Sequence, residues 1–126
     1  MTKRAVVIGA GHYLPERIVE NAEFEGKIDT SDEWIRSRSG IERRHFVGEG
    51  ETTSTMATAA AKAALADAGK TAADVDAVIV ATSTPDLTFP SAATMVQAQL
   101  EMERGFAFDV QAVCAGFVYG LANANA

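Results

Sequence analysis

Apolar residues gather in three short, largely continuous runs along this 126-residue chain, at residues 4–8, 77–81 and 106–110. Continuous apolar runs of this length are typical of strands that are covered on both faces of a sheet. We therefore predict three buried strands. The segment 41–50, which is polar and carries two glycines, is predicted to be a loop.

The segments between these runs carry helix signals. Residues 30–38 begin with capping and acidic residues and become basic, an order that matches the helix dipole, and Gly40 follows as a stop. The alanine-rich segment 53–68 ends at Gly69 and implies a helix that packs very close to its neighbours. Helices are predicted at residues 21–26, 30–38, 53–68, 91–100 and from near Cys114 onward.

Strands that alternate with helices predict an α/β fold, with a mostly parallel sheet and helices on both faces. The sequence shows no internal repeat and no low-complexity linker, so residues 1–126 are interpreted as one unit.

Composition narrows the class of protein. Hydrophobic residues make up 48% of the chain and charged residues 22%, as in packed soluble proteins. No apolar run approaches the ~20 residues of a membrane helix, and no signal peptide is recognisable, so we expect a cytoplasmic protein without a membrane partner. The single cysteine excludes an internal disulfide and a multi-cysteine metal site, and we predict no metal. A net charge of -6 argues against nucleic-acid binding.

Two local patterns leave alternatives open. Four arginines fall within nine residues, and they form either a solvated helix end or a local anion site, because the arginine fork suits phosphate. Gly9 and Gly11 follow the first predicted strand, but Leu14 stands where a dinucleotide fingerprint has its third glycine. A tight turn is therefore the favoured interpretation of these glycines. The arginines are Arg36, Arg38, Arg43 and Arg44.

Cys114 has the surroundings of a nucleophile. It follows the third predicted strand and precedes a predicted helix, whose N-terminal dipole favours a thiolate. Its small neighbours Ala115 and Gly116 would let a thioester carbonyl approach. The alternative is a buried cysteine that acts as a small hydrophobe.

Four segments together resemble the ketoacyl-ACP synthase III family, in family order and at family spacing. Residues 29–41 resemble its DTSDEWI-x-x-R-[ST]-G-I segment, and 89–92 its FPS-A segment. Residues 108–117 resemble its FD-x-x-x-x-CAGF active-site segment, and 11–15 fit its opening. The resemblance implies the first half of a thiolase fold, incomplete over residues 1–126 with the C-terminal half absent, usually in a homodimer.

The resemblance also implies an activity. Cys114 would take an acyl group from acyl-CoA, and decarboxylative condensation with malonyl-ACP would then give 3-oxoacyl-ACP in the initiation of fatty acid synthesis. Acyl-CoA is a substrate here, and no cofactor is expected. Trp34 would stack on the CoA adenine, with Arg38 and Thr30 along the nucleotide. Phe89 would close the partner subunit's acyl pocket, and Ser83 would lie near that pocket.

The family's catalytic histidine and asparagine are expected in the missing half, since His12 and His45 match no catalytic motif. We therefore expect this chain alone to be inactive in condensation. Two alternatives stay open. One is the same cysteine chemistry on another acyl acceptor, in secondary metabolism or 3-hydroxy-3-methylglutaryl-CoA synthesis. The other is a noncatalytic fragment for dimerisation or docking of the acyl carrier protein.

Overall fold

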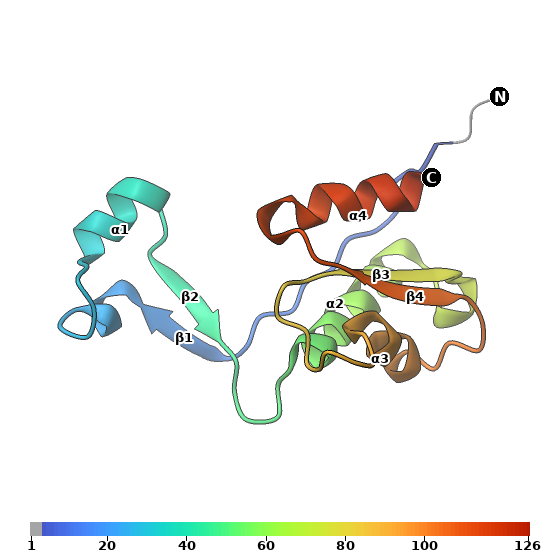
Figure 1. The fold of residues 1–126 in the computed structure, drawn as a ribbon, viewed down its shortest axis with the longest axis horizontal. Helices are drawn as coiled ribbons and strands as arrows, with labels where there is room; N and C mark the ends of the chain where they lie inside the picture. Colours follow the sequence, from blue (N-terminus) through green and yellow to red (C-terminus); the bar gives the residue numbers. More distant parts are fainter. Residues whose placement is uncertain (1–3) are drawn as a thin grey trace. The chain divides into compact units, whose positions relative to one another are not determined.

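The structure, a computed structural model, describes residues 4–126 and divides them into two compact units (Figure 1). The larger unit comprises residues 4–13 and 52–126, and the small unit comprises residues 14–51. Each unit has its own two-stranded sheet, so they are described separately.

In the larger unit, β3 (Ala77–Ala81) and β4 (Phe106–Val110) pair in parallel. The helices α2 (Thr53–Ala68) and α3 (Ala92–Gln99) lie on one side of this pair, and α4 (Gly116–Asn125) lies on the other (Figure 1). The predicted α/β class, the parallel pairing and the helices on both faces are therefore confirmed. Two short 3-10 helices, η2 (Ala72–Asp74) and η3 (Val113–Ala115), precede β3 and α4.

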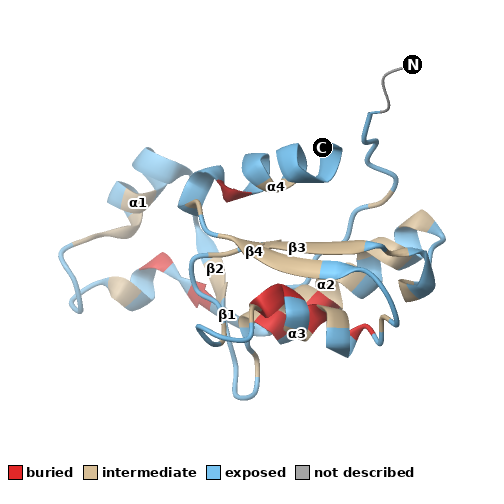
Figure 2. Cartoon of the chain, turned by 45° about the vertical axis from the view of Figure 1, so that its right-hand side comes forward, coloured by how far each residue is buried: buried red, intermediate tan, exposed pale blue. Residues whose placement is uncertain are grey.

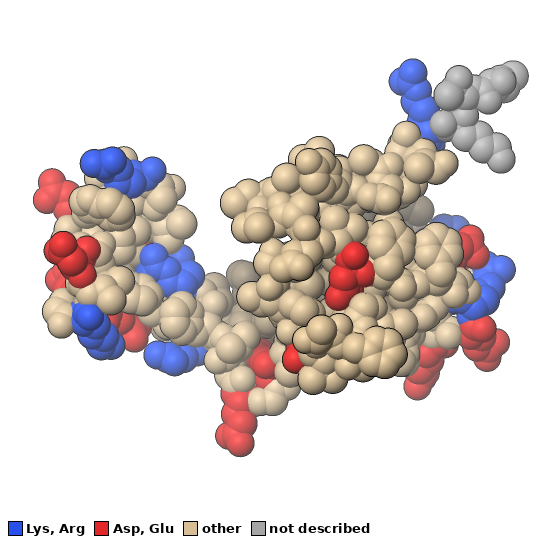
Figure 3. Space-filling view, in the orientation of Figure 1, with Lys and Arg blue, Asp and Glu red and all other residues tan. Residues whose placement is uncertain are grey.

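The buried apolar side chains of the larger unit belong to α3 and the residue after it, and Figure 2 shows them in red. Ala92 and Ala93 are fully buried, and Val96 and Leu100 are nearly so. Small residues at the start of α3 let its backbone approach the strands closely. By contrast α4 carries no charged residue and exposes its large apolar side chains, and Figure 3 shows few charges over it.

The ends of α2 and α3 carry recognisable caps. Thr52 caps α2 by accepting a hydrogen bond from the Thr55 N–H, and Gly69 ends it in the left-handed region at a φ of 62°. Ser91 caps α3 by accepting a bond from the Thr94 N–H. These capping bonds supply partners for N–H groups that the helix itself leaves free.

The prediction of a strand at residues 4–8 is wrong. Residues 4–8 form no strand, and Val6, Val7 and Ile8 are exposed. The backbone N–H groups of Ala5 and Ala10 instead donate to the side chains of Asn125 and Asp67, each at 2.9 Å. The apolar run predicted burial, but among the described residues no strand lies alongside to supply ladder bonds.

The two glycines after this segment make a close approach to α2. A Cβ built on Gly9 would lie 2.7 Å from the Ala64 carbonyl oxygen, and one on Gly11 would overlap the Ala64 backbone nitrogen. Both glycines are therefore required by packing against an alanine-rich helix, as the predicted close packing of residues 53–68 implied. This explains the glycine pair without a nucleotide.

The small unit contains η1 (Asn21–Phe24) and α1 (Asp32–Ser39), together with an antiparallel pair formed by β1 (Arg17–Glu20) and β2 (Arg43–Phe46). The short helix at 21–26 and the helix at 30–38 are confirmed within two residues. The prediction that residues 41–50 form a loop is wrong over the four residues of β2. This strand reads Arg-Arg-His-Phe and belongs to a two-stranded sheet, so it lacks the apolar run that marks a buried strand.

Candidate functional site

Cys114 lies in the middle of η3, the turn that joins β4 to α4, and its side chain is exposed. Val113 before it has a φ of 45°, a left-handed conformation that is costly for a β-branched residue and is found mostly at functional turns. Gly116 after it packs against Ala81, where an added Cβ would lie 3.2 Å from the Ala81 Cβ. The thiol is thus presented on a constrained turn and does not serve as a core hydrophobe in this chain.

The strand register brings the loop that contains Ser83 to the same edge of the sheet. Ala81 is opposite Val110 at the end of the parallel pair, and the Thr82 N–H donates to the Val110 carbonyl at 3.1 Å. Ser83 and Cys114 therefore both follow the carboxyl ends of paired strands. In open α/β sheets this edge is where ligands bind.

The loop of residues 82–91, called the 82–91 loop below, is tied to α2 by an aspartate. Asp86 accepts hydrogen bonds from the Ser54 N–H at 2.8 Å and the Ser54 hydroxyl at 2.6 Å. Burial raises the pKa of Asp86, but the bonds from Ser54 and Thr52 outweigh that effect, so its pKa lies below the ordinary aspartate value. Ser54 is fully buried, and it also accepts a bond from Gln99 of α3 at 3.1 Å.

A second aspartate fixes the other end of this loop. Asp109 on β4 accepts bonds from the first two N–H groups of α3, those of Ala92 at 2.9 Å and Ala93 at 2.7 Å. The loop between these two anchors exposes Phe89, whose side chain is 88% accessible. Sequence reasoning missed both aspartates as organising residues. The available signal was Asp109, the only charged residue in the apolar run 106–110.

Trp34 and Arg38 lie together on the exposed face of α1. The Arg38 guanidinium lies 5.5 Å from the centroid of the Trp34 ring, because residues four apart on an α-helix share one face. Trp34 is 56% exposed and is therefore not a core anchor in the small unit. Thr30 and Trp34 also help to line a cavity of about 330 Å³, with Phe24, Ile28, Ile35, Arg44 and Phe46.

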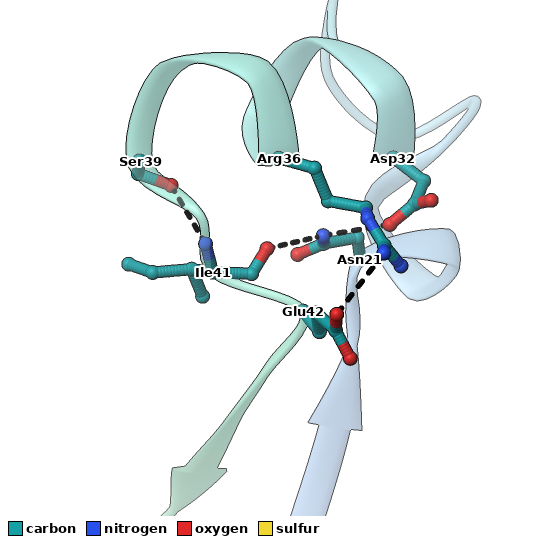
Figure 4. Close-up of polar contacts among 6 residues, drawn as sticks. All are labelled: Asn21, Asp32, Arg36, Ser39, Ile41 and Glu42. Atoms are coloured by element: carbon teal, nitrogen blue, oxygen red, sulfur yellow. Dashed lines mark hydrogen bonds and ion pairs between the residues drawn. The ribbon is translucent and has the colours of Figure 1, made fainter.

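The four arginines do not converge on a single anion site. Arg36 pairs with Glu42 at 3.0 Å, and Arg44 donates to the Asn21 side chain at 2.7 Å while lying over the Phe24 ring (Figure 4 shows the Arg36 pair). Arg38 lies over Trp34. Two of the four thus have internal partners, and Arg38 is the one that accompanies an exposed aromatic surface.

The histidines and acidic residues do not form a catalytic or metal cluster. His45 Nδ1 makes a hydrogen bond with the Pro15 carbonyl at 2.5 Å, as expected for a structural residue, and His12 is exposed. Within residues 4–126, no group of three histidine, cysteine or acidic side chains is arranged to hold a metal ion. The helices in this range are also too short or too polar to cross a membrane.

Comparison with known proteins gives close matches along the whole chain. No protein-family model matches it. It is 80% identical over 126 residues to the beta-ketoacyl-[acyl-carrier-protein] synthase III of Ruegeria sp. (strain TM1040), of which it covers 39%. The chain thus spans about two fifths of the length of the curated relatives it matches.

Solved structures agree with this match. The 3-oxoacyl-[acyl-carrier-protein] synthase III of Aquifex aeolicus VF5 is 48% identical with a TM-score of 0.87, over 93% of this chain and 38% of that one. The priming beta-ketosynthase of the R1128 polyketide pathway is 35% identical with a TM-score of 0.89, over 99% of this chain and 38% of that one.

Proposed function

Because this chain belongs to the beta-ketoacyl-[acyl-carrier-protein] synthase III family, with its thiolase-like fold, we propose that the whole protein is a condensing enzyme that starts fatty acid synthesis. The resemblance of the four sequence segments is thereby confirmed at the level of family and fold. The reaction, its substrates and the residue roles below are inferences for the complete protein.

The nucleophile in this proposal is Cys114. Its thiolate attacks the thioester carbonyl of acyl-CoA, the tetrahedral intermediate expels the CoA thiolate, and an acyl-enzyme thioester remains. Decarboxylation of malonyl-ACP then releases carbon dioxide, and the resulting carbanion attacks the acyl-enzyme to give 3-oxoacyl-ACP and the free thiolate. The observation that carries the proposal is the exposed thiol on a constrained turn at the carboxyl end of β4.

The nucleotide end of acyl-CoA is assigned to α1 of the small unit. An exposed indole beside a guanidinium suits an adenine that is attached to phosphates, because the ring stacks on the base and the arginine pairs with the anion. Thr30 lines the same cavity as Trp34, and its hydroxyl oxygen is buried without a hydrogen-bond partner among the described residues, so we assign Thr30 to the wall of the nucleotide site. The four-residue spacing of Trp34 and Arg38 supports this assignment.

The acyl chain is assigned to the 82–91 loop. Ser83 follows the carboxyl end of β3, and Phe89 projects its ring away from the larger unit's own core. An exposed phenylalanine on an anchored loop suits a residue that closes the pocket of a partner subunit, so we propose a homodimer. Acyl carrier protein is the proposed macromolecular partner and the cytoplasm the proposed location.

A different acceptor is the second candidate. The 35% identity to a priming beta-ketosynthase of a polyketide pathway is the observation that favours it, and it leaves the chemistry at Cys114 unchanged. The identity to the synthase III relatives is far higher, so fatty acid synthesis remains the first proposal. The expectation that residues 1–126 alone do not complete condensation stays a prediction.

The test separates the two half-reactions. The complete protein is incubated with radiolabelled acetyl-CoA, digested, and searched for label on the Cys114 peptide. We expect label on this peptide and none in the matched Cys114→Ser variant. Release of carbon dioxide after malonyl-ACP is added then identifies the acceptor. Labelling at another residue refutes the nucleophile assignment, and labelling without release of carbon dioxide refutes the acceptor.

A further inference from the structure

The helix that carries Trp34 and Arg38 is not held by burial. None of the eight residues of α1 is buried, and the helix is strongly polar. Isolated helices of this length are unstable in water, because the cost of nucleation exceeds what a few backbone bonds return. Some other contact must therefore fix α1 on the small unit.

The Asp32 N–H donates to the Glu25 carboxylate at 2.9 Å, and the second, buried contact is the side chain of Asn21. It is 1% exposed, and its amide nitrogen donates to the Asp32 carboxylate at 2.8 Å and to the Ile41 carbonyl at 2.7 Å (Figure 4). Asp32 is the first residue of α1, and Ile41 follows the Gly40 cap at its end. One buried amide thus bridges the two ends of the helix, and both of its N–H groups are used.

The remaining oxygen of this amide connects the helix to the sheet. Asn21 Oδ1 accepts a bond from Arg44 of β2 at 2.7 Å, and the Asn21 backbone N–H donates to the Glu42 carbonyl at 3.3 Å. Figure 4 shows a further link on this side, the Arg36–Glu42 ion pair. That pair is about half exposed and solvent screens it, so it adds little.

Asn21 and the proposed nucleotide site lie on opposite faces of α1. Asp32, which Asn21 contacts, precedes Trp34 by two residues, and residues two apart on an α-helix are roughly 200° apart around the axis. A base that stacks on Trp34 is therefore out of reach of the Asn21 amide. An effect of Asn21 on such a ligand passes through the position of the helix, or through Arg44, which Asn21 holds and which lines the same cavity as Trp34.

We infer that Asn21 is a positioning residue for acyl-CoA recognition: it fixes both ends of α1 and thereby the Trp34–Arg38 face. This inference rests on the proposed function, because it needs that face to bind the CoA nucleotide. It predicts that loss of the Asn21 bridge weakens binding of the nucleotide end and leaves the chemistry at Cys114 intact.

The test uses Asn21→Asp in the complete protein. This change keeps an acceptor for Arg44, removes both N–H donors and places a carboxylate beside Asp32. We expect KM for acetyl-CoA to rise about 10- to 100-fold, because the helix that carries Trp34 and Arg38 loses its buried anchor. The kcat for acylation, and the KM for acetyl-pantetheine, which lacks the nucleotide, should stay within about twofold.

A compensating variant distinguishes positioning from general damage. The double change Asn21→Asp with Asp32→Asn restores a donor and an acceptor across this contact, and we expect it to recover part of the lost acetyl-CoA affinity. Glu42→Gln is the matched control, because it removes the exposed ion pair but not the Asn21 bridge, and KM should not change. If Asn21→Asp does not fold, Asp32→Ala removes one of the two bridging bonds and should raise the same KM several-fold.

The outcomes separate this inference from the proposed function. If Trp34→Ala raises KM for acetyl-CoA selectively but neither Asn21→Asp nor Asp32→Ala does, the inference about Asn21 is overturned. An equal loss with acetyl-CoA and acetyl-pantetheine overturns it as well. If Trp34→Ala itself has no selective effect, the assignment of the nucleotide to α1 fails.

Discussion

Replacement of Asp86 tests whether the 82–91 loop is anchored as the structure indicates. Asp86→Ala removes the acceptor of two bonds from Ser54, one from its N–H at 2.8 Å and one from its hydroxyl at 2.6 Å, and also the partner of the Thr52 hydroxyl. Ser54 is fully buried, so its N–H and hydroxyl lose their charged partner inside the unit. The variant should therefore lose stability and loosen the loop that bears Ser83 and Phe89.

The size of the loss follows from these two bonds. A hydrogen bond to a charged group contributes about 1.5–3 kcal/mol, and a buried donor left without a partner costs a similar amount. The Ser54 hydroxyl keeps its contact with Gln99, so the two losses do not add fully. We expect about 2–4 kcal/mol in all, which corresponds to a fall in Tm of roughly 5 °C or more.

The pH dependence of Tm gives an independent check that the Asp86 carboxylate is responsible for the loss of stability. The pKa of Asp86 lies below its ordinary value in the folded chain, so its bonds stabilise the fold above the unfolded-state pKa near 3.8. This stabilisation is lost as the pH falls through the lowered, folded-state pKa. The difference in Tm between the parent protein and Asp86→Ala should thus be largest near neutral pH and shrink on strong acidification.

Asp74→Ala is the matched control in the same thermal melts. Hydrogen bonds from the Thr71 backbone and hydroxyl lower the pKa of Asp74 as well, but both residues are exposed, so water can take over the lost bonds. Its Tm should stay close to that of the parent. Equal shifts for Asp86→Ala and Asp74→Ala would refute the argument, because burial of the donor would then have no influence.

Two further predictions concern substrate recognition in the complete protein. Trp34→Ala and Arg38→Ala should each raise KM for acyl-CoA about tenfold or more. Acylation from a short pantetheine thioester should stay nearly unchanged, because that donor has no adenine or phosphate to lose. Equal effects on both acyl donors in steady-state assays would make these residues structural. Phe89→Ala should shift the preferred acyl length toward longer chains, because a large ring is removed from the proposed pocket. If activity across C2 to C8 acyl-CoA substrates does not change, the assignment of Phe89 to the acyl pocket is contradicted.

Much of the larger unit could be predicted from sequence because its signals are local. The runs 77–81 and 106–110 have no competing helical period, and Gly69 and Ser91 mark helix ends through their own conformation or hydroxyl. The α1 helix was predictable for the same reason, through its acids, bases and Gly40. Such elements are specified by residues within one or two turns of each other.

The errors fall where pairing depends on distant residues. Residues 4–8 have the composition of a strand, but strand formation needs a neighbour, and the Asn125 side chain bonds to this segment instead. In the small unit, β1 and β2 are strands of only four residues each, and their pairing joins Arg17 with Phe46 across 29 positions. Apolar periodicity carries no information about such a pairing.

The residues of the candidate site also fall into two groups. Some are recognisable in the sequence by their side-chain chemistry, and others matter only through contacts with residues far away in the sequence. Cys114, Trp34 and Arg38 stand out in the sequence because a thiol before a helix, or an indole one turn from a guanidinium, is already a chemical pattern. Asn21 bonds to groups 11, 20 and 23 positions away, and Asp86 to one 32 away, so nothing adjacent marks them. Burial of a polar side chain costs free energy unless it is hydrogen-bonded, and the fold decides which partners it meets. Asn21 uses both donors and its acceptor, so few other side chains could replace it there, although it reads in the sequence as an ordinary surface asparagine.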